Sequence, residues 1–324
     1  MGDYFLQQVV NAVSAGSLYA LMAVGLALIF SILRLINFAH GDIMMVAAYL
    51  VTFALFAGMP LPAALVFMVV GAVVIGLLME RIAYRPIRGA AEVAMLLTSF
   101  AVGQILQNGT LLVSRLAGEP VQIAFPAPDI VNGVVAFGAI TVPKVNIVSL
   151  VTGAVLLTLL TVFVTRTRLG LSMHAAAEDL PAARLMGIRV NRVVATAFAI
   201  SSGLAAVAGF LYASQAGQIN PYLGFTPVLK AFIAAVIGGF GSLSGAVVGA
   251  YALGILEVIP TALSGIADIL PPGAVPPGVH DLLTQVFPSS LGSYRDAFVF
   301  VFLILMLLFR PNGIVGGGGR EEVP

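Results

Sequence analysis

Long apolar runs alternate with short polar segments along the whole chain. Six runs contain no Asp, Glu, Lys or Arg: residues 9–33, 61–79, 93–114, 145–165, 193–229 and 231–256. About 20 apolar residues cross a bilayer as a helix, and the last two runs are long enough to hold more than one element. The pattern predicts an all-α polytopic membrane protein with about eight transmembrane helices and additional broken or re-entrant segments.

Two of the apolar stretches are interrupted. The sequence RLINFAHG (34–41) separates two apolar runs near the N-terminus, and GGFGSLSG (238–245) interrupts the stretch 226–263. Clustered glycines weaken a helix because Gly loses the most backbone entropy on ordering. At the second break we therefore expect either a re-entrant pair or two shortened helices that meet there.

The distribution of basic residues indicates the orientation in the membrane. Ten of the fifteen Lys and Arg residues fall in segment 80–92, segment 166–192 and the C-terminal tail, which the positive-inside rule places in the cytoplasm. Segments 117–146 and 264–293 carry more acidic than basic residues and are predicted to be periplasmic loops. Counting the crossings between these segments implies an outside N-terminus.

Composition supports a lipid environment and excludes several chemistries. The 324 residues are 60% hydrophobic and 9% charged, with a mean hydropathy of +1.08, whereas soluble domains carry roughly 25% charged residues. The absence of cysteine excludes disulfides and thiolate metal sites. A net charge of +1 argues against a nucleic-acid partner. The three histidines fall in three different predicted compartments, so a His-rich metal site is not expected: His40, His174 and His280.

Motifs for covalent chemistry are also missing. No G-x-x-x-x-G-K-[ST] sequence is present, so the chain cannot cradle ATP phosphates by that route. The H-E-x-x-H and G-x-S-x-G patterns do not occur either. The chain is therefore predicted to be non-catalytic and to hold no cofactor of its own.

The segment NFAHGD (37–42) places an amide, an imidazole and a carboxylate between two apolar runs. A charge at the bilayer centre costs about 2.5–3.5 kcal/mol or more, so such groups are usually paired or line a polar cavity. One interpretation is a helix break that faces a pathway, with the kink at Gly41. The alternative is an interfacial pair of Arg34 and Asp42 at the cytoplasmic headgroups. For the motif as a whole we favour the first, because the second break repeats the feature.

The two breaks indicate an internal duplication, a feature common in transporters. Each is followed later by a helix that ends in Arg-Pro, in RPIRG (85–89) and RPNG (310–313). In the second break, glycines spaced by four predict one helix face suited to close packing: Gly241, Gly245 and Gly249.

Segment 166–192 is too polar to span a membrane but carries helix signals. Asp179 suits an N-cap, Pro181 a first turn and Gly187 the position after a helix end. These signals predict a short surface helix at about 180–186. We interpret it as a docking helix for a cytoplasmic partner, and the alternative is an amphipathic connector that seals the bilayer surface. The exposed face would offer Arg184, Leu185 and Met186.

The predicted outer segments carry weaker signals. Asn132-Gly133 lies between β-branched residues and predicts a β-hairpin within 129–137. Five prolines mark 264–293 as an irregular loop, with a short interfacial helix near 280–286. Lys230 and Glu257 flank the second break at its outer ends, where they either pair or face water.

Together these motifs resemble the permeases of branched-chain amino-acid ABC importers. The resemblance lies in GLALIFSILRLINFAHGDIMMVAAY (25–49), RPIRG (85–89), AAAEDLPAARLMGIRVNRVVATAFAISSGLAAVAGFLYA (175–213), FIAAVIGGFGSLSGAVVGAYALGILE (232–257) and FRPNGIVG (309–316). It covers nearly the whole chain and is similar to the smaller of the two permeases in the high-affinity leucine/isoleucine/valine type. The stretch 264–293 is longer than the family pattern.

The resemblance implies a single multi-pass permease domain, residues 1–324, in the bacterial inner membrane. It implies a homologous second permease, two cytoplasmic ATPase subunits that bind ATP and Mg, a periplasmic substrate-binding protein and the lipid bilayer as partners. Segment 166–192 resembles the segment that couples to the ATPase, through Glu178, Asp179, Pro181, Ala183, Arg184 and Gly187. By similarity the breaks border the translocation pathway, at Asn37, His40, Gly41, Asp42, Gly238, Gly239, Gly241, Ser242 and Gly245.

We therefore expect half of a translocation pathway for branched-chain or related amino acids delivered by the binding protein. Within the same importer class, urea-like amides and small aromatic acids remain alternatives. A secondary transporter driven by an ion gradient would need intramembrane carboxylates, for which only Asp42 and Glu257 qualify. A polytopic membrane enzyme would depend on His40 or Asp42 for catalysis.

Overall fold

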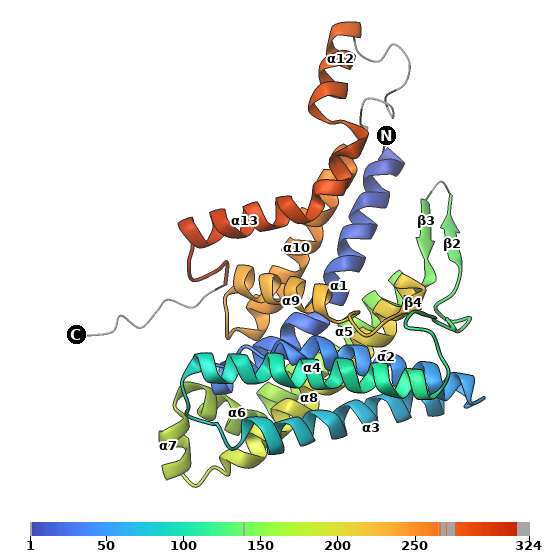
Figure 1. Cartoon of the computed structure of the whole chain (residues 1–324). Coiled ribbons are helices and arrows are strands. Elements are labelled where there is room, and N and C mark those ends of the chain that lie inside the picture. Colours follow the sequence, from blue (N-terminus) through green and yellow to red (C-terminus); the bar gives the residue numbers. More distant parts are fainter. Residues whose placement is uncertain (1, 139, 265, 267–269, 271–275, 316–324) are drawn as a thin grey trace.

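A computed structural model describes residues 2–138, 140–264, 266, 270 and 276–315, and most of them are helical (Figure 1). The helices are α1 (Gly2–Leu33), α2 (Ala39–Phe56), α3 (Leu61–Met79), η1 (Glu80–Tyr84), α4 (Glu92–Leu116), α5 (Lys144–Arg166), α6 (Arg168–Glu178), α7 (Leu180–Leu185), α8 (Val190–Ala216), α9 (Phe225–Gly238), α10 (Leu243–Leu263), α12 (Pro277–Val286), η2 (Ser289–Tyr294) and α13 (Arg295–Phe309). Among the described residues, eight helical stretches are long and apolar enough to cross a membrane, as the apolar runs predict.

The helices form a buried centre and an outer layer. The apolar windows of α1, α2 and α8 are mostly buried inside the chain, whereas only about a fifth of each window in α3, α4 and α5 is buried. Helix α1 packs along α10, α8, α9 and α5, and α3 and α4 cover α2 from outside (Figure 1). Apolar side chains on the outer helices therefore face lipid or another chain, because water would not tolerate so much exposed apolar surface.

The first predicted break is a full interruption between α1 and α2. Helix α1 ends at Leu33, and Arg34 then adopts a left-handed conformation with φ of 53°. The backbone runs without regular structure to Phe38 before α2 begins. The left-handed residue turns the chain, because its geometry cannot continue a right-handed helix.

Backbone contacts between glycines hold the short helix α9 at both ends. A Cβ added to Gly41 or to Gly224 would collide with the backbone carbonyl of the other residue. At the far end, a Cβ on Gly245 would lie 2.6 Å from the carbonyl oxygen of Gly238. The 14 residues of α9 span about 21 Å. This helix therefore connects the two predicted breaks, one at each end.

The second break comprises residues 239–242 and separates α9 from α10. Ser242 caps α10, since its Oγ accepts a hydrogen bond from the Gly245 N–H at 3.0 Å. The prediction that Gly241 shares a helix face with Gly245 and Gly249 is wrong, because its φ of 96° places it in the left-handed region outside α10. The other two glycines do pack against α9.

Residues after α13 complete the second break. The N–H groups of Ile314 and Val315 donate to the carbonyls of Ile237 and Gly238 at 2.8 and 3.0 Å. These carbonyls lie at the C-terminal end of α9, where a helix has no internal donors left. The segment RPNG therefore brings the tail back to cap α9, a role that the sequence did not reveal.

Two small sheets lie at the end of the molecule opposite α7 (Figure 1). β1 (Ile123–Ala124) pairs with β4 (Gln218–Ile219), and β2 (Val134–Phe137) pairs with β3 (Ile140–Pro143). A hairpin thus exists, but the prediction that Asn132-Gly133 forms its turn is wrong. These residues precede β2, and the chain before them forms a turn in which the N–H groups of Val131 and Asn132 donate to the Pro128 carbonyl, so no strand precedes them there.

The long loop 264–293 is partly helical. Helix α12 confirms the short helix predicted near 280–286, although it begins at Pro277. It extends away from the rest of the bundle in Figure 1. The remainder of this predicted loop includes 265, 267–269 and 271–275, which lie outside the described residues.

The three basic segments gather at one end, as their common assignment predicts. An Arg88 Nη1 group donates to Asn191 Oδ1 at 2.8 Å and so joins segment 80–92 to the end of segment 166–192. Asn312 of the tail lines the same cavity as His174 of α6. The side of the membrane on which this end lies stays a prediction.

We predict that Gly224→Ala destabilises the fold by about 1–3 kcal/mol, because the added methyl group overpacks the contact with Gly41. Gly109→Ala is the matched control, since its Cβ would meet no atom within 4 Å. Thermal denaturation of the two purified variants in detergent measures the difference. Equal midpoints would show that the contact is not tight.

Candidate functional site

The polar segment after α5 folds into two short helices. Thr167 caps α6 by accepting a hydrogen bond from Gly170 N–H at 3.0 Å. Asp179 caps α7 in the same way, with 2.9 Å between its Oδ1 and the Ala182 nitrogen. Gly187 has a φ of 80° after the helix ends. The predicted helix near 180–186, its cap and its terminating glycine are therefore confirmed, whereas α6 was not predicted.

Helix α7 has a buried anchor and an exposed apolar tip. Ala183 is buried, whereas Leu185 and Met186 are 89% and 83% exposed. Arg184, Pro181, Asp179 and Glu178 are also exposed. Large apolar side chains that stand free at a polar end of a protein are typical of an interaction site.

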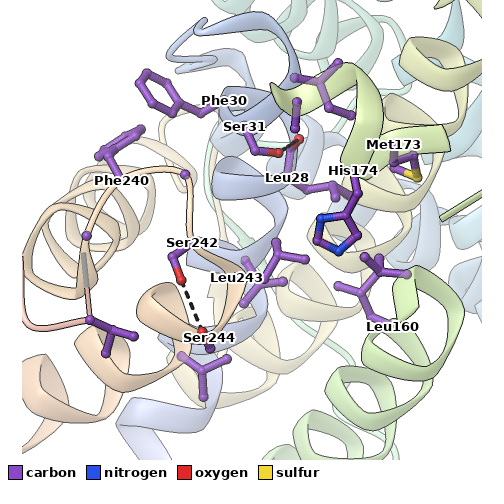
Figure 2. A pocket seen from close by; sticks show the side chains of 18 of the residues that line it. Leu28, Phe30, Ser31, Leu160, Met173, His174, Phe240, Ser242, Leu243 and Ser244 are labelled. Carbon is purple, nitrogen blue, oxygen red and sulfur yellow. Dashed lines mark hydrogen bonds between the residues drawn. The ribbon is translucent and has the colours of Figure 1, made fainter. Parts of the chain in front are cut away.

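A cavity of about 950 Å³ lies beside this segment (Figure 2). Its walls come from the end of α1, the end of α5, α6, the second break and the tail. Figure 2 shows His174 of α6 opposite Ser242, Leu243 and Ser244 of the break. The polar residues that line it are Ser31, Arg34, Thr161, Thr165, His174, Glu178, Ser242, Ser244 and Asn312.

This cavity unites two of the predicted sites. Gly239, Gly241 and Ser242 from the pathway prediction line it together with Glu178 from the coupling prediction. Gly238 and Gly245 do not line it but pack against each other beside it. The structure thus brings the coupling segment and the second break to opposite walls of one space.

Asn37 and His40 tie the first break to three neighbouring elements. Asn37 accepts a hydrogen bond from the Tyr84 hydroxyl at 2.8 Å. The His40 Nδ1 lies 3.1 Å from Ser201 Oγ, whose own hydrogen is donated to Gly25 O. The imidazole therefore donates from Nδ1 to Ser201. Both predicted pathway residues are fully buried and hold the break against α1, η1 and α8.

Asp42 lies in the first turn of α2 and is 7% exposed. Its Oδ1 accepts a hydrogen bond from the Gln107 amide of α4 at 2.8 Å. Arg34 is exposed at the large cavity and forms no ion pair with Asp42. The alternative of an interfacial Arg34–Asp42 pair is therefore wrong, because the chain turns Asp42 inward against α4.

A charged cluster that joins four helices was only partly visible in the sequence. Glu257 of α10 accepts hydrogen bonds from Tyr19 Oη and Lys230 Nζ, each at 2.5 Å. Lys230 also lies 3.2 Å from Asp296 of α13. The sequence left open whether Lys230 and Glu257 pair, and they do. Tyr19 carried no signal, because it lies 238 residues away in the chain.

A second ion pair closes the turn after α3. Glu80 lies in the π-helical turn η1, is buried and pairs with Arg88 at 2.5 Å. Burial lowers the pKa of the Arg88 guanidinium from its ordinary value, and the neighbouring Glu80 opposes that shift. The guanidinium of an arginine stays protonated even when it is partly buried, so the ion pair holds segment 85–89 against the bundle.

We predict that Lys230→Met destabilises the protein by about 3–5 kcal/mol, because it leaves Glu257 buried without its nearest cation. Adding Glu257→Gln to this variant should restore part of the loss. Lys144→Met is the control, since Lys144 lies at an exposed hydrogen bond. Melting temperatures in detergent test this, and equal losses in the single and double variants would contradict it.

The chain is similar to known membrane permeases over nearly its whole length. A family model described as "branched-chain amino acid transport system / permease component" matches residues 8–309. The chain is 35% identical over 329 residues to the high-affinity branched-chain amino acid transport system permease protein BraD of Pseudomonas aeruginosa, covering 99% of this chain and 98% of BraD. It is 35% identical over 330 residues to LivH of Escherichia coli, with the same coverage. It is 28% identical over 252 residues to the autoinducer 2 import system permease protein LsrC of Escherichia coli, covering 76% and 68%.

Proposed function

Because the chain belongs to the branched-chain amino acid permease family, we propose that it forms half of the translocation pathway of an ATP-driven importer. The observation that carries the proposal is the large cavity, whose walls join the coupling segment to the second break. The chain itself contributes helices and no covalent chemistry. ATP and Mg bind to partner ATPase subunits in this proposal.

The segment α6–α7 transmits motion from the ATPase. Leu185 and Met186 are exposed and suit insertion into a groove of a cytoplasmic partner, while the buried Ala183 fixes α7 to the bundle. Arg184 beside them offers a charge for orientation. When a nucleotide moves the ATPase, the docked tip moves with it, and α6 shifts one wall of the cavity.

The second break is suited to respond to that shift. Gly239 and Gly241 both have positive φ values, 108° and 96°, and form a short loop at positions where glycine has the greatest backbone freedom. The loop adjoins α10, which Ser242 caps. A rigid helix pair joined by such a loop can take two packed arrangements, as alternating access requires.

The pathway follows α9 in this proposal. Its C-terminal end lies at the large cavity, and its N-terminal end meets Gly41 beside Asp42. Both predicted pathway segments therefore adjoin one element. A homologous second permease would complete the conduit, and a periplasmic binding protein would deliver cargo to the end that carries the small sheets.

Branched-chain amino acids are the proposed cargo. BraD and LivH, both 35% identical over nearly the whole chain, are named for these substrates. LsrC is more distant and is named for a different cargo. An ion-gradient mechanism would have to rely on Asp42 alone, because Glu257 is already paired with Lys230. The proposed location is the inner membrane, with multiple crossings.

We predict that Leu185→Ser with Met186→Ser weakens binding of the ATPase subunits by tenfold or more, because truncated interface anchors cost about 2 kcal/mol each. Substrate-stimulated ATP hydrolysis by the reconstituted complex should fall accordingly. Val70→Ser is the control, since it removes an exposed apolar side chain in the middle of α3, away from α7 and from the small sheets.

Co-purification of the ATPase with each variant separates loss of docking from loss of folding. Normal stimulated hydrolysis in the double variant, with the ATPase bound as tightly as before, would refute the docking role of α7. Monodisperse permease without bound ATPase would support it.

A further inference from the structure

Three carboxylates are buried among the described residues, and they are treated differently. Glu80 lies 2.5 Å from Arg88, and Glu257 lies 2.5 Å from Lys230. Asp42 forms no ion pair within the described part of the chain. A buried charge without an opposite charge is costly. The chain therefore supplies a cation to two of its buried acids and leaves the third without one.

Burial disfavours a charge on Asp42, and several of its neighbours partly offset that cost. It lies in the first turn of α2, where the helix dipole stabilises negative charge. The N-terminal end of α9 meets α2 at the Gly41–Gly224 contact and adds a second positive helix end. Gln107 donates to one carboxylate oxygen at 2.8 Å. The other oxygen lies over Gly103 of α4, where a side chain would fill its space.

A small cavity of about 50 Å³ adjoins the carboxylate. Its walls include the rings of Phe38, Phe100 and Phe225 together with the polar side chains of Ser99 and Gln104. This volume is large enough for an ammonium group with a methylene or for a few waters, and too small for a branched side chain. Aromatic rings beside a carboxylate are compatible with a cation, which they attract through their faces.

The face of α4 beside this cavity is polar halfway along a membrane-spanning helix. Gln104 is exposed, and its amide donates to Gln107 Oε1 at 3.3 Å. Asn108, also exposed, lies one turn further along. Exposed amides at this depth are not suited to lipid, because the hydrocarbon interior offers them no hydrogen-bond partner. These residues therefore indicate a hydrated face that leads to Asp42.

We propose that Asp42 binds the primary ammonium group of the transported amino acid, with Gln107 positioning the carboxylate. The ammonium group of the cargo supplies the positive charge that no described residue of the chain places beside Asp42. The rest of the cargo lies outside the small cavity, along the face of α4 that carries Gln104 and Asn108. This inference rests on the proposed function, whose pathway passes the N-terminal end of α9.

Charge-selective thiol labelling tests the site without relying on transport. The chain contains no cysteine, so Gln104→Cys provides a single reactive group on it. The assembled importer in membranes is treated with a cationic trimethylammonium methanethiosulfonate and with an anionic sulfonate methanethiosulfonate. We expect the cationic reagent to react at least about tenfold faster, because a negative charge lies within several ångströms in a medium of reduced dielectric constant.

Two comparisons sharpen the test. Adding Asp42→Asn should abolish the preference, and Ile105→Cys, at the neighbouring exposed apolar position, should react with neither reagent. Leucine at saturating concentration should slow labelling of Cys at position 104, whereas 4-methylpentanoate, which lacks the ammonium group, should not. The reagent ratio and the leucine protection need no change at Asp42, so they stand even if that variant does not assemble.

Equal rates with both reagents, protection by 4-methylpentanoate as strong as by leucine, or no labelling at position 104 would each overturn the ammonium site. None of these results affects docking of α7, which stimulated ATP hydrolysis measures separately. Failure of the docking test with a preserved reagent preference would instead remove the ATP-driven mechanism and leave the site.

Discussion

Glycine-to-glycine backbone contact at each end of α9 is the constraint on which the arrangement depends. At about 21 Å this helix is shorter than the roughly 30 Å of a hydrocarbon core, so it cannot span the membrane alone. Gly41 and Gly224 bring its beginning against α2, and Gly238 and Gly245 bring its end against α10. The carbonyls left free at Ile237 and Gly238 receive donors from the tail. Each end is thus held in place by backbone contacts with another part of the chain.

Two of the three buried acids of the described chain are paired with a basic residue. The cluster around Glu257 holds α1, α9, α10 and α13 together, and the Glu80–Arg88 pair secures the turn after α3. In both places the buried acid already has a cation within the chain. Asp42 differs, and it lies where α2, α4 and α9 meet. The chain therefore separates charges that stabilise its architecture from a charge that stays available.

Local sequence signals predicted local structure well. The apolar runs indicated the membrane helices, and Asp179, Pro181 and Gly187 located α7 within a residue, because caps and turns depend on neighbours in the chain. The NFAHGD motif identified the first break and drew attention to Asp42. What could not be predicted depends on distant partners: Gln107 beside Asp42, Tyr19 beside Glu257 and the tail on α9. The predicted position of the hairpin turn was wrong, because the strand that pairs with β2 follows it in the chain and does not precede Asn132-Gly133.

The return of the tail to α9 sets an order of events during biosynthesis. Helix α9 leaves the ribosome long before Ile314 and Val315 do, yet those two residues supply the donors for its final carbonyls. Until α13 has been inserted, the loop 239–242 has an open end. This end of the bundle is therefore completed only when the chain is nearly finished, and an extension fused directly behind Val315 would be held close to it.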